Sequence, residues 1–393
     1  MDCLTLVSAG PARWTAFPRH GQGTRTSVGR YRDMTRMISK QDAAAVAAKV
    51  RLAYGLTWIA GLETGISRKK GKRGFIYYSS DGERIADQVE IARLNALAIP
   101  PAYIDVVISE NPRSHLQAVG TDARGRKQYR YHPDWHSERG RAKFDRLVEF
   151  AGHIPTIRRQ VDADLRSRGL TMDKALATIV WMLDNLYIRV GNREYAQENR
   201  SFGLTTLRNR HVRVDGGRVK FRFKGKSGKE WNLVHTDRRI ANVVRRLQEL
   251  PGQQLFQYVS ENGDCRQITS QDVNAYIQEA CGRDFSSRQF RTWGATCMAV
   301  SELAPLDAAS SQRAVACQIN NAIDAVAAAL GNTRSVCRSS YIHPAVFEDF
   351  KQGKLAGILK FRTRSAKRLR WMAPEEICVE RWLAERASTL SDR

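Results

Sequence analysis

The chain has 393 residues, enough for two or three domains with a substantial core, and 42% of them are hydrophobic and 26% charged, as in a soluble globular protein. Its 64 lysines and arginines outnumber the 40 acidic residues, and the formal net charge of +24 predicts an anionic partner, most simply a nucleic acid. No apolar run approaches the roughly 18 residues of a membrane span, which excludes an integral membrane protein of the helical class.

The seven cysteines are scattered and never spaced as C-x-x-C, which favours a reducing compartment over a disulfide framework or a zinc site. The chain also has no Gly-rich phosphate loop, no H-E-x-x-H motif and no acidic metal-binding cluster. We therefore exclude ATP-driven motors, expect neither a metal nor a nucleotide cofactor, and place the protein in the cytoplasm with the nucleoid.

Taken in chain order, residues 1–40 are Ser/Thr/Gly/Arg-rich and predict a disordered basic extension, part of which an overextended start codon would also explain. Residues 41–135 predict a small, mostly β domain. Its expected elements are strands at 74–78, 103–108, 116–121 and 127–131 and a helix at 87–97 that Pro100 and Pro101 stop.

Residues 140–355 predict a mainly helical domain. Thr171 is the expected cap of a helix that runs to Val190 and Gly191, and further helices are expected at 236–250, at 270–281 and after Ser286. Between them, alternating apolar residues and two Gly-containing turns predict an antiparallel hairpin unit over 212–233. The fold class is therefore α+β, and residues 356–393 are interpreted as a basic C-terminal tail in which 377–386 could form a short helix.

The helical domain also carries residues suited to metal-free cleavage of a phosphodiester. That reaction requires a nucleophile, a general acid for the leaving hydroxyl, and cations on the nonbridging oxygens. Tyr341, in a polar segment after a helix that Gly331 closes, is a candidate nucleophile. Lys226, on a hairpin turn, suits the acid, and Arg189 and Arg291 suit a phosphate clamp.

Taken singly, each of these residues has an ordinary structural explanation. Tyr341 fits a half-buried aromatic, Arg189 a partner of a helix dipole, and Lys226 a solvated turn lysine. Arg291 fits a surface cation on its helix, and Asn332 fits the continuation of a helix C-cap. Their order along the chain favours the chemical interpretation.

In that order, and in its local motifs, the chain resembles the type IB DNA topoisomerases in their compact bacterial and poxvirus form. The matching segments are Ile-Arg-Val-Gly-Asn-Arg-Glu-Tyr at 188–195, Phe-Lys-Gly-Lys at 223–226, Phe-Arg-Thr-Trp-Gly at 290–294, Leu-Gly-Asn-Thr at 330–333, and Ser339 to Tyr341. The resemblance covers about residues 45–355. It implies a catalytic core of the kind shared by type IB topoisomerases and tyrosine recombinases.

The resemblance implies roles for these residues. Tyr341 would attack a backbone phosphate, form a 3′-phosphotyrosyl link and expel a 5′-hydroxyl that Lys226 protonates. Arg189, Arg291 and Asn332 would stabilise the transition state, Asn332 standing where several members have histidine. The free end would then swivel, and supercoils of either sign would relax without ATP or metal.

The resemblance also implies a monomer that closes as a C-shaped clamp around double-stranded DNA. The expected DNA-binding residues are Gln128, Tyr129, Tyr131, Arg193, Tyr195 and Arg288. Glutamine is suited to adenine edges and tyrosine to thymine methyls and phosphates. A strand with surface aromatics is the alternative for 128–131.

Two other functions are consistent with parts of the sequence. A tyrosine recombinase would use similar catalytic residues, although its second-arginine motif usually begins with histidine and continues Arg-His, whereas Arg288-x-x-Arg291-Thr292 stands here. A basic nucleoid-binding protein with an inert Tyr341 would explain the charge alone.

Overall fold

The computed structural model describes residues 7–8, 55–72, 74–123, 125–260 and 262–391. These residues form two compact units that divide between Ala142 and Lys143, with Val7–Ser8 belonging to the second. The predicted disordered extension over 1–40 lies outside the described residues except for Val7–Ser8. Those two residues form β1, which pairs in parallel with β9 (Glu230–Thr236).

The first unit is built on a five-stranded antiparallel sheet with the strand order β3-β2-β4-β5-β6. Four of the five strands and helix α2 (Gln88–Ala96) lie where the sequence predicts them, and Asp87 caps the helix. The exception is β2, a sequence of Ile-Ser-Arg-Lys-Lys-Gly that has one large apolar residue and no alternation. Pairing with β3 and β4, a tertiary effect, makes this segment a strand. The strands are β2 (Ile66–Gly71), β3 (Gly74–Tyr78), β4 (Ile104–Ile108), β5 (Leu116–Thr121) and β6 (Lys127–Tyr131).

The second unit is mainly helical and holds two smaller sheets, so that the described chain is a mixed α/β protein with small, largely antiparallel sheets. Helix α3 carries the chain from the first unit into the second. The helices are α3 (Pro133–Arg166), α4 (Met172–Leu186), α5 (Arg193–Asn199), α6 (Arg238–Gln248), α7 (Ser270–Cys281), α8 (Ser287–Leu303), α9 (Gln312–Leu330), α10 (Arg334–Ser340), α11 (Ala345–Lys351), α12 (Ala366–Leu369) and α13 (Pro374–Ser391), with 3-10 turns η1 (Leu204–Thr206), η2 (Asn209–His211), η3 (Lys226–Gly228) and η4 (Ile358–Lys360).

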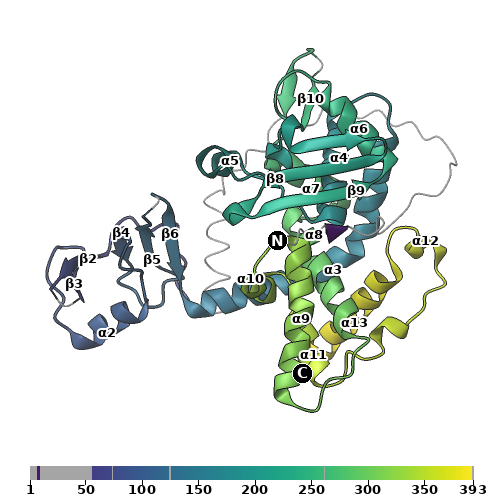
Figure 1. The fold of residues 1–393 in the computed structure, drawn as a ribbon. Helices are drawn as coiled ribbons and strands as arrows, with labels where there is room; N and C mark the ends of the chain where they lie inside the picture. The colour runs from purple at the N-terminus through teal and green to yellow at the C-terminus, as the bar shows by residue number, and fades with distance from the viewer. Residues whose placement is uncertain (1–6, 9–54, 73, 124, 261, 392–393) are drawn as a thin grey trace, which may run out of the picture. The chain divides into compact units, whose positions relative to one another are not determined.

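The predicted hairpin unit is confirmed as β7 (Val212–Asp215), β8 (Arg218–Lys224) and β9, to which β1 adds an edge strand. Side chains of β8 alternate strictly between exposed and buried, and Val219, Phe221 and Phe223 face the core. Helix α6 packs on β7 and β8 (Figure 1). A separate hairpin of β10 (Gln257–Val259) and β11 (Cys265–Gln267) extends from the same unit.

Two helix ends place the residues of the candidate site. Thr171 caps α4 as predicted, its Oγ1 accepting from the Lys174 amide at 3.2 Å. The helix ends at Leu186 because Tyr187 is left-handed, with φ 55°. Arg189 therefore lies beyond the helix and not in its last turn. Gly331 closes α9 with φ 61°, as predicted.

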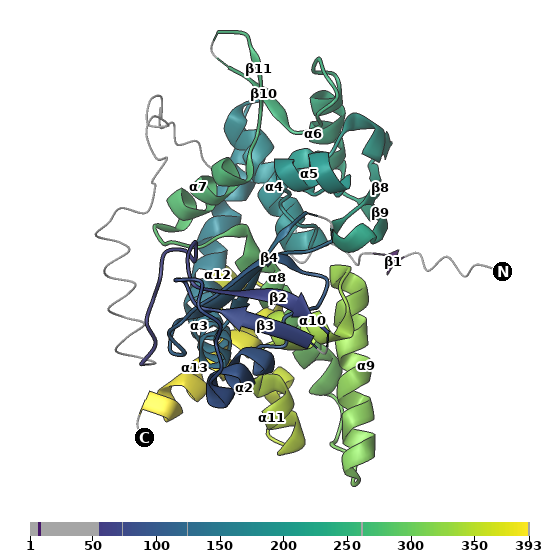
Figure 2. The ribbon, with the colours of Figure 1, turned by 90° about the vertical axis from the view of Figure 1, so that its left-hand side faces the viewer.

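The polar segment after α9, for which the sequence indicated no regular element, forms a helix. Thr333 caps a further helix, α10, by accepting from the Val336 amide, and Tyr341 follows directly at its C-terminal end. Helix α9 runs alongside α8, and α10 leaves it at a bend of 96° (Figure 2). No single helix in the described part of the chain is long and apolar enough to cross a membrane, and only this bent pair reaches that hydropathy.

The C-terminal segment is not the simple basic tail that the sequence suggested. Helix α13 packs against α8, and Ile377, Val379 and Leu383 are buried. Glu376 is 1% exposed and forms, together with Asp184 of α4, a buried ion cluster around Arg158 of α3. The short helix predicted over 377–386 thus lies within a longer one that belongs to the core.

Candidate active site

Tyr341 lies at the C-terminal end of α10 and is 5% exposed. Its amide and that of Ile342 both donate to the carbonyl of Cys337, at 3.1 and 3.0 Å, which closes the last turn of the helix. The phenol is thereby directed into the protein, where two arginines from other elements meet it.

Arg189 holds the phenol and Asn332 at the same time. Its Nη1 donates to the Tyr341 hydroxyl at 2.9 Å, and its Nη2 donates to Oδ1 of Asn332 at 2.6 Å. The three residues come from the segment after α4, from the end of α10 and from the residue after Gly331. Hydrogen bonds of Arg189 therefore join three of the five residues predicted for the chemistry.

The backbone around Arg189 is fixed by the motif that follows it. The amides of Leu204 and Thr205 donate to the carbonyls of Arg189 and Val190, at 2.9 and 2.7 Å. Gly203 permits this close approach, because a Cβ there would lie 2.6 Å from the Arg189 carbonyl oxygen. The Gly-Leu-Thr-Thr segment thus acts as a backbone cradle for the first arginine.

Arg291 reaches the phenol from α8 and is 3% exposed. Its guanidinium carbon lies 5.0 Å from the centre of the Tyr341 ring, its Nη2 donates to the Leu330 carbonyl at 2.8 Å, and its Nη1 donates to the Tyr187 carbonyl. Burial lowers the pKa of Arg291 to about 10, with Tyr341 opposing and Arg189 reinforcing this shift. A buried guanidinium held only by neutral acceptors is suited to receive an anion.

The electrostatics of the site favour the phenolate. Burial raises the pKa of Tyr341, but the guanidiniums of Arg291 and Arg189 act in the opposite direction and prevail, so that its pKa lies below 10. Among the described residues, no carboxylate forms an ion pair with either arginine. The positive charge therefore remains available to the phenol and to an incoming anion.

Two buried donors in this cluster, Nε of Arg291 and Nδ2 of Asn332, have no well-aligned acceptor in the described part of the chain. The Arg291 guanidinium nevertheless interacts with the Tyr341 phenol and lowers its pKa. Burial raises the pKa of the Cys337 thiol, and the Asn332 side chain, which interacts with that thiol, opposes this rise. Because Arg189 occupies Oδ1 of Asn332, the amide presents its NH₂ group on the other side. Unsatisfied buried donors are rare in folded proteins and call for an explanation, which a bound oxyanion would provide.

Lys226 lies on the exposed turn between β8 and β9 and forms none of the hydrogen bonds that join the other four residues. The base of this turn nevertheless adjoins the site through Trp231. A Cβ at Gly225 would lie 2.7 Å from Nε1 of Trp231, and one at Gly331 would lie 2.8 Å from its Cζ2. The indole thus links the lysine turn to the residue that precedes Asn332.

The predicted DNA-binding strand is β6, an edge strand of the first unit. Tyr129 is 50% exposed, and its ring stacks on that of Tyr131 at 6.3 Å. Gln128 does not share their face, because successive residues of a strand alternate and its amide donates to Asp122 at 3.0 Å. The structure brings the two tyrosines together and leaves Gln128 apart.

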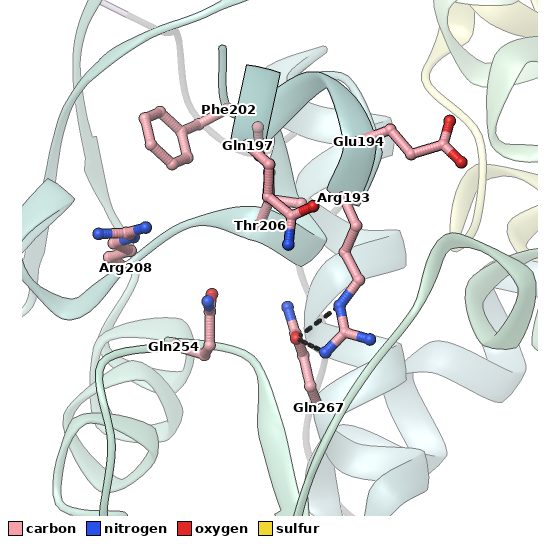
Figure 3. Close-up of a pocket in the computed structure, with 9 residues that line it drawn as sticks. Arg193, Glu194, Gln197, Phe202, Thr206, Arg208, Gln254 and Gln267 are labelled. Carbon is pink, nitrogen blue, oxygen red and sulfur yellow. Dashed lines mark hydrogen bonds between the residues drawn. The ribbon is translucent and has the colours of Figure 1, made fainter. Parts of the chain in front are cut away.

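The other predicted DNA-binding residues lie on the second unit. Arg193 begins α5, and its Nε donates to Gln267 at 3.0 Å, at the edge of a cavity of about 590 Å³ (Figure 3). The amide of Gln267 donates in turn to the Thr205 carbonyl. Tyr195 lies in α5, but its side chain is outside the described set. Arg288 is exposed on α8, three residues before Arg291.

Three residues that anchor the segment around Tyr341 were not predicted from the sequence, namely Lys143, Phe144 and Thr296. Lys143 of α3 donates to the Ser340 carbonyl, Thr296 of α8 accepts from the His343 amide at 3.2 Å, and His343 lies against Phe144. These contacts join residues far apart in the chain, so no local pattern reveals them. No group of His, Cys, Asp and Glu within the described ranges could hold a metal ion.

Comparison with known proteins places this arrangement in a family. Residues 132–368 match the family described as eukaryotic DNA topoisomerase I, catalytic core, and residues 74–122 match that described as bacterial DNA topoisomerase IB, N-terminal domain.

Individual proteins to which the chain is similar carry the names of the same family. The chain is 33% identical over 288 residues to a DNA topoisomerase 1B of Acanthamoeba polyphaga mimivirus, and the aligned region covers 72% of this chain and 86% of the relative. It is 24% identical over 278 residues to DNA topoisomerase 1B of Vaccinia virus, strain Copenhagen, covering 69% and 85%. It is 26% identical over 166 residues to DNA topoisomerase 1 of Schizosaccharomyces pombe, covering 41% and 19%.

Proposed function

Because the chain belongs to the type IB DNA topoisomerases, we propose that it relaxes DNA supercoils through a covalent link at Tyr341. One observation carries this assignment of residues: two arginine guanidiniums converge on the Tyr341 phenol and have only neutral hydrogen-bond acceptors there. Such a site lowers the pKa of the nucleophile and offers the charge that a phosphate needs. The family membership decides against the recombinase and the inert nucleoid protein.

The proposed first step is attack of the Tyr341 oxygen on a backbone phosphorus. A 3′-phosphotyrosyl bond forms as the bond to the 5′-oxygen breaks. Arg291 Nε and Asn332 Nδ2, the two buried donors without a well-aligned acceptor, would bind the nonbridging oxygens. Arg189 would stay hydrogen-bonded to the Tyr341 oxygen after that oxygen has become part of the phosphotyrosyl ester. The reverse attack by the 5′-hydroxyl restores the duplex, and the covalent bond preserves the energy of the phosphodiester, so that no ATP is consumed.

Lys226 is the proposed general acid for the 5′-hydroxyl. Its exposed turn position supports closure onto the site when DNA binds. We expect Lys226→Ala to cleave plain DNA slowly and a 5′-bridging phosphorothiolate rapidly, because a thiolate leaves without a proton. Single-turnover cleavage of both substrates measures this. Equal slowing on the two substrates would remove Lys226 from this role.

The partner is double-stranded DNA, in keeping with the family and the net charge of +24. We further propose that the protein acts as a monomer in the cytoplasm, on the nucleoid, and that its two units bind the duplex as a clamp. In this clamp Tyr129 and Tyr131 of the first unit would contact the DNA grooves. We also infer that the catalytic unit shares its core with tyrosine recombinases, as its order of catalytic residues suggests.

Relaxation of plasmids tests the proposal directly. In EDTA and without ATP, we expect the protein to relax negatively and positively supercoiled plasmid, Tyr341→Phe to be inactive, and Tyr258→Phe, a change in the β10 hairpin, to be active. A covalent adduct should appear on denaturing gels only when Tyr341 is present. Normal relaxation by Tyr341→Phe would refute the assignment of the nucleophile.

A further inference from the structure

The backbone that carries Tyr341 has an anchor on the helix that enters the catalytic unit. Lys143 lies near the start of that part of α3, and its ammonium donates to the carbonyl of Ser340, the residue directly before Tyr341. The two residues are separated by 197 positions in the sequence. The contact therefore belongs to the tertiary structure and not to the local architecture of α10.

The Ser340 carbonyl is a natural site for a cation. It is the last carbonyl of α10. The last carbonyls of a helix receive no hydrogen bond from an amide of the same helix. They also form the negative end of the helix dipole, which a nearby cation stabilises. Lys143 thus satisfies a carbonyl at the point where the chain leaves the helix and turns into the nucleophile.

The surroundings of Lys143 hold its ammonium in place. Nζ lies 4.1 Å from the centre of the Phe144 ring, and the side chain is partly buried. Burial, with a smaller contribution from the positive charge of Arg288, lowers the pKa of Lys143 to about 8. Burial makes the charged form of Lys143 less favourable, and the hydrogen bond from its ammonium to the Ser340 carbonyl offsets this cost.

The residues after Tyr341 are fixed by the neighbouring elements. The His343 amide donates to Thr296 of α8 at 3.2 Å, and the His343 ring lies 5.1 Å from that of Phe144. Burial, Arg386 and Lys143 lower the pKa of His343 to about 4, although Asp349 opposes this, so the imidazole stays neutral during catalysis. The nucleophile is therefore held from both sides, and on its N-terminal side Lys143 contacts the carbonyl of the residue directly before it.

We infer that Lys143 is a positioning residue for catalysis, which sets the direction of the Tyr341 phenol by holding the Ser340 carbonyl. This inference rests on the proposed role of Tyr341 as the nucleophile. Lys143 need not touch the reacting atoms. An error of about 1 Å in the placement of a reacting group can slow a reaction by about 100-fold, so loss of this anchor is expected to slow cleavage.

The competing role for a partly buried cation near DNA is a direct phosphate contact. Two measurements on the full chain separate the two roles: the single-turnover rate of cleavage of bound duplex, and the Kd for a duplex measured on a Tyr341→Phe background. The variant is Lys143→Met, which keeps the aliphatic stem and loses the charge. Lys354→Met, which removes a charge from an exposed site of the same unit, is the matched control.

We expect Lys143→Met to slow cleavage by about 10- to 100-fold with a Kd equal to that of the control. A raised Kd with a shallower salt dependence and an unchanged cleavage rate would identify a phosphate contact and overturn the inference. A cleavage rate equal to that of Lys354→Met would overturn it as well. If Tyr341→Phe itself cleaves DNA, the proposed function fails first, which distinguishes that outcome from failure of the positioning role.

The pH dependence gives a signature that a purely structural residue would not show. The charged and titratable groups that face this ammonium are Arg288 of α8 and His343, the latter neutral above a pKa of about 4. As the pH rises through about 8, wild-type Lys143 loses its charge. A neutral amine donates more weakly and no longer interacts with the helix dipole, so the ratio of the wild-type rate to that of Lys143→Met should fall, while the ratio for Lys354→Met stays constant.

Lys143→Arg decides the matter if the methionine variant does not fold. Arginine keeps its charge at high pH, so the ratio of the wild-type rate to the Lys143→Arg rate should also fall as the pH rises through about 8. A ratio that stays flat in this range would contradict the inference.

Discussion

Gly294 of α8 lies against the residue that places both arginines. A Cβ at this position would lie 2.2 Å from Cε1 of Tyr187 and 2.7 Å from its Cζ. Tyr187 is buried and left-handed, its carbonyl accepts from Arg291, and Arg189 follows two residues later. A methyl group at position 294 therefore requires the buried Tyr187 ring to shift, and we expect that shift to disturb the backbone that holds both arginines. We expect Gly294→Ala to damage stability and catalysis together.

The magnitude follows from two opposing effects. Replacing a glycine within a helix by alanine adds about 1 kcal/mol to the free energy of unfolding, whereas an overpacked methyl group removes about 1–3 kcal/mol. The net loss is about 0–2 kcal/mol, which leaves most of the protein folded. Cleavage is more sensitive, since a displacement of about 1 Å at Arg189 or Arg291 lowers the rate by about 100-fold.

Gly152→Ala is the matched control for Gly294→Ala. Gly152 also lies within a helix, α3, but a Cβ there would have no atom within 4 Å. Urea unfolding and single-turnover cleavage should show Gly152→Ala to be more stable than wild type by about 1 kcal/mol and fully active. If Gly294→Ala matched it in both assays, the contact with Tyr187 would not position the arginines and the reasoning would be wrong.

Two further predictions concern the buried charges. Glu376→Ala should lower the free energy of unfolding by about 3–5 kcal/mol in urea, because it leaves a buried arginine with one carboxylate, whereas Glu375→Ala, at an exposed position, should change little. Equal stability of the two variants would contradict the cluster. Arg189→Gln removes one cause of the lowered pKa of Tyr341, so the rise of the cleavage rate with pH should shift to higher pH; an unshifted profile would mean that Arg189 does not act on the phenol.

The regular elements of this protein could be predicted because their signals are local. Alternation over 212–233 predicted the hairpin unit, and Thr171 and Gly331 marked helix ends that the structure confirms. β2 escaped prediction because its stability comes from the strands on either side and not from its own lysine-rich sequence.

The C-terminal segment shows the limit of local signals. Its many arginines suggested a solvated tail, although the partners that draw it into the core lie far back in the chain. Glu376 pairs with Arg158 across 218 positions, and its carboxylate also accepts from the indole of Trp293. A carboxylate among basic residues looks ordinary in the sequence, and only the packing of α13 reveals that it is buried.

The sequence predicted which residues form the candidate site but not how they contact one another. The motifs pointed to Tyr341, Arg189, Arg291 and Asn332, and the structure joins these four while Lys226 remains on its turn. Lys143 gave no signal, because a lysine on a polar helix face is ordinary and its acceptor is a backbone carbonyl 197 positions away.

The arrangement also bears on how the site engages DNA. The Tyr341 hydroxyl accepts from Arg189, so the phenol and the first arginine are already joined within the fold. A guanidinium has five donors, and Arg189 uses its Nη1 on the phenol and its Nη2 on Asn332. The second bond engages Oδ1 of Asn332 and leaves its NH₂ group without a well-aligned acceptor. In the proposed mechanism, one residue, Arg189, would therefore serve the nucleophile and a phosphate donor at once, and Lys226 would have to approach them from its turn.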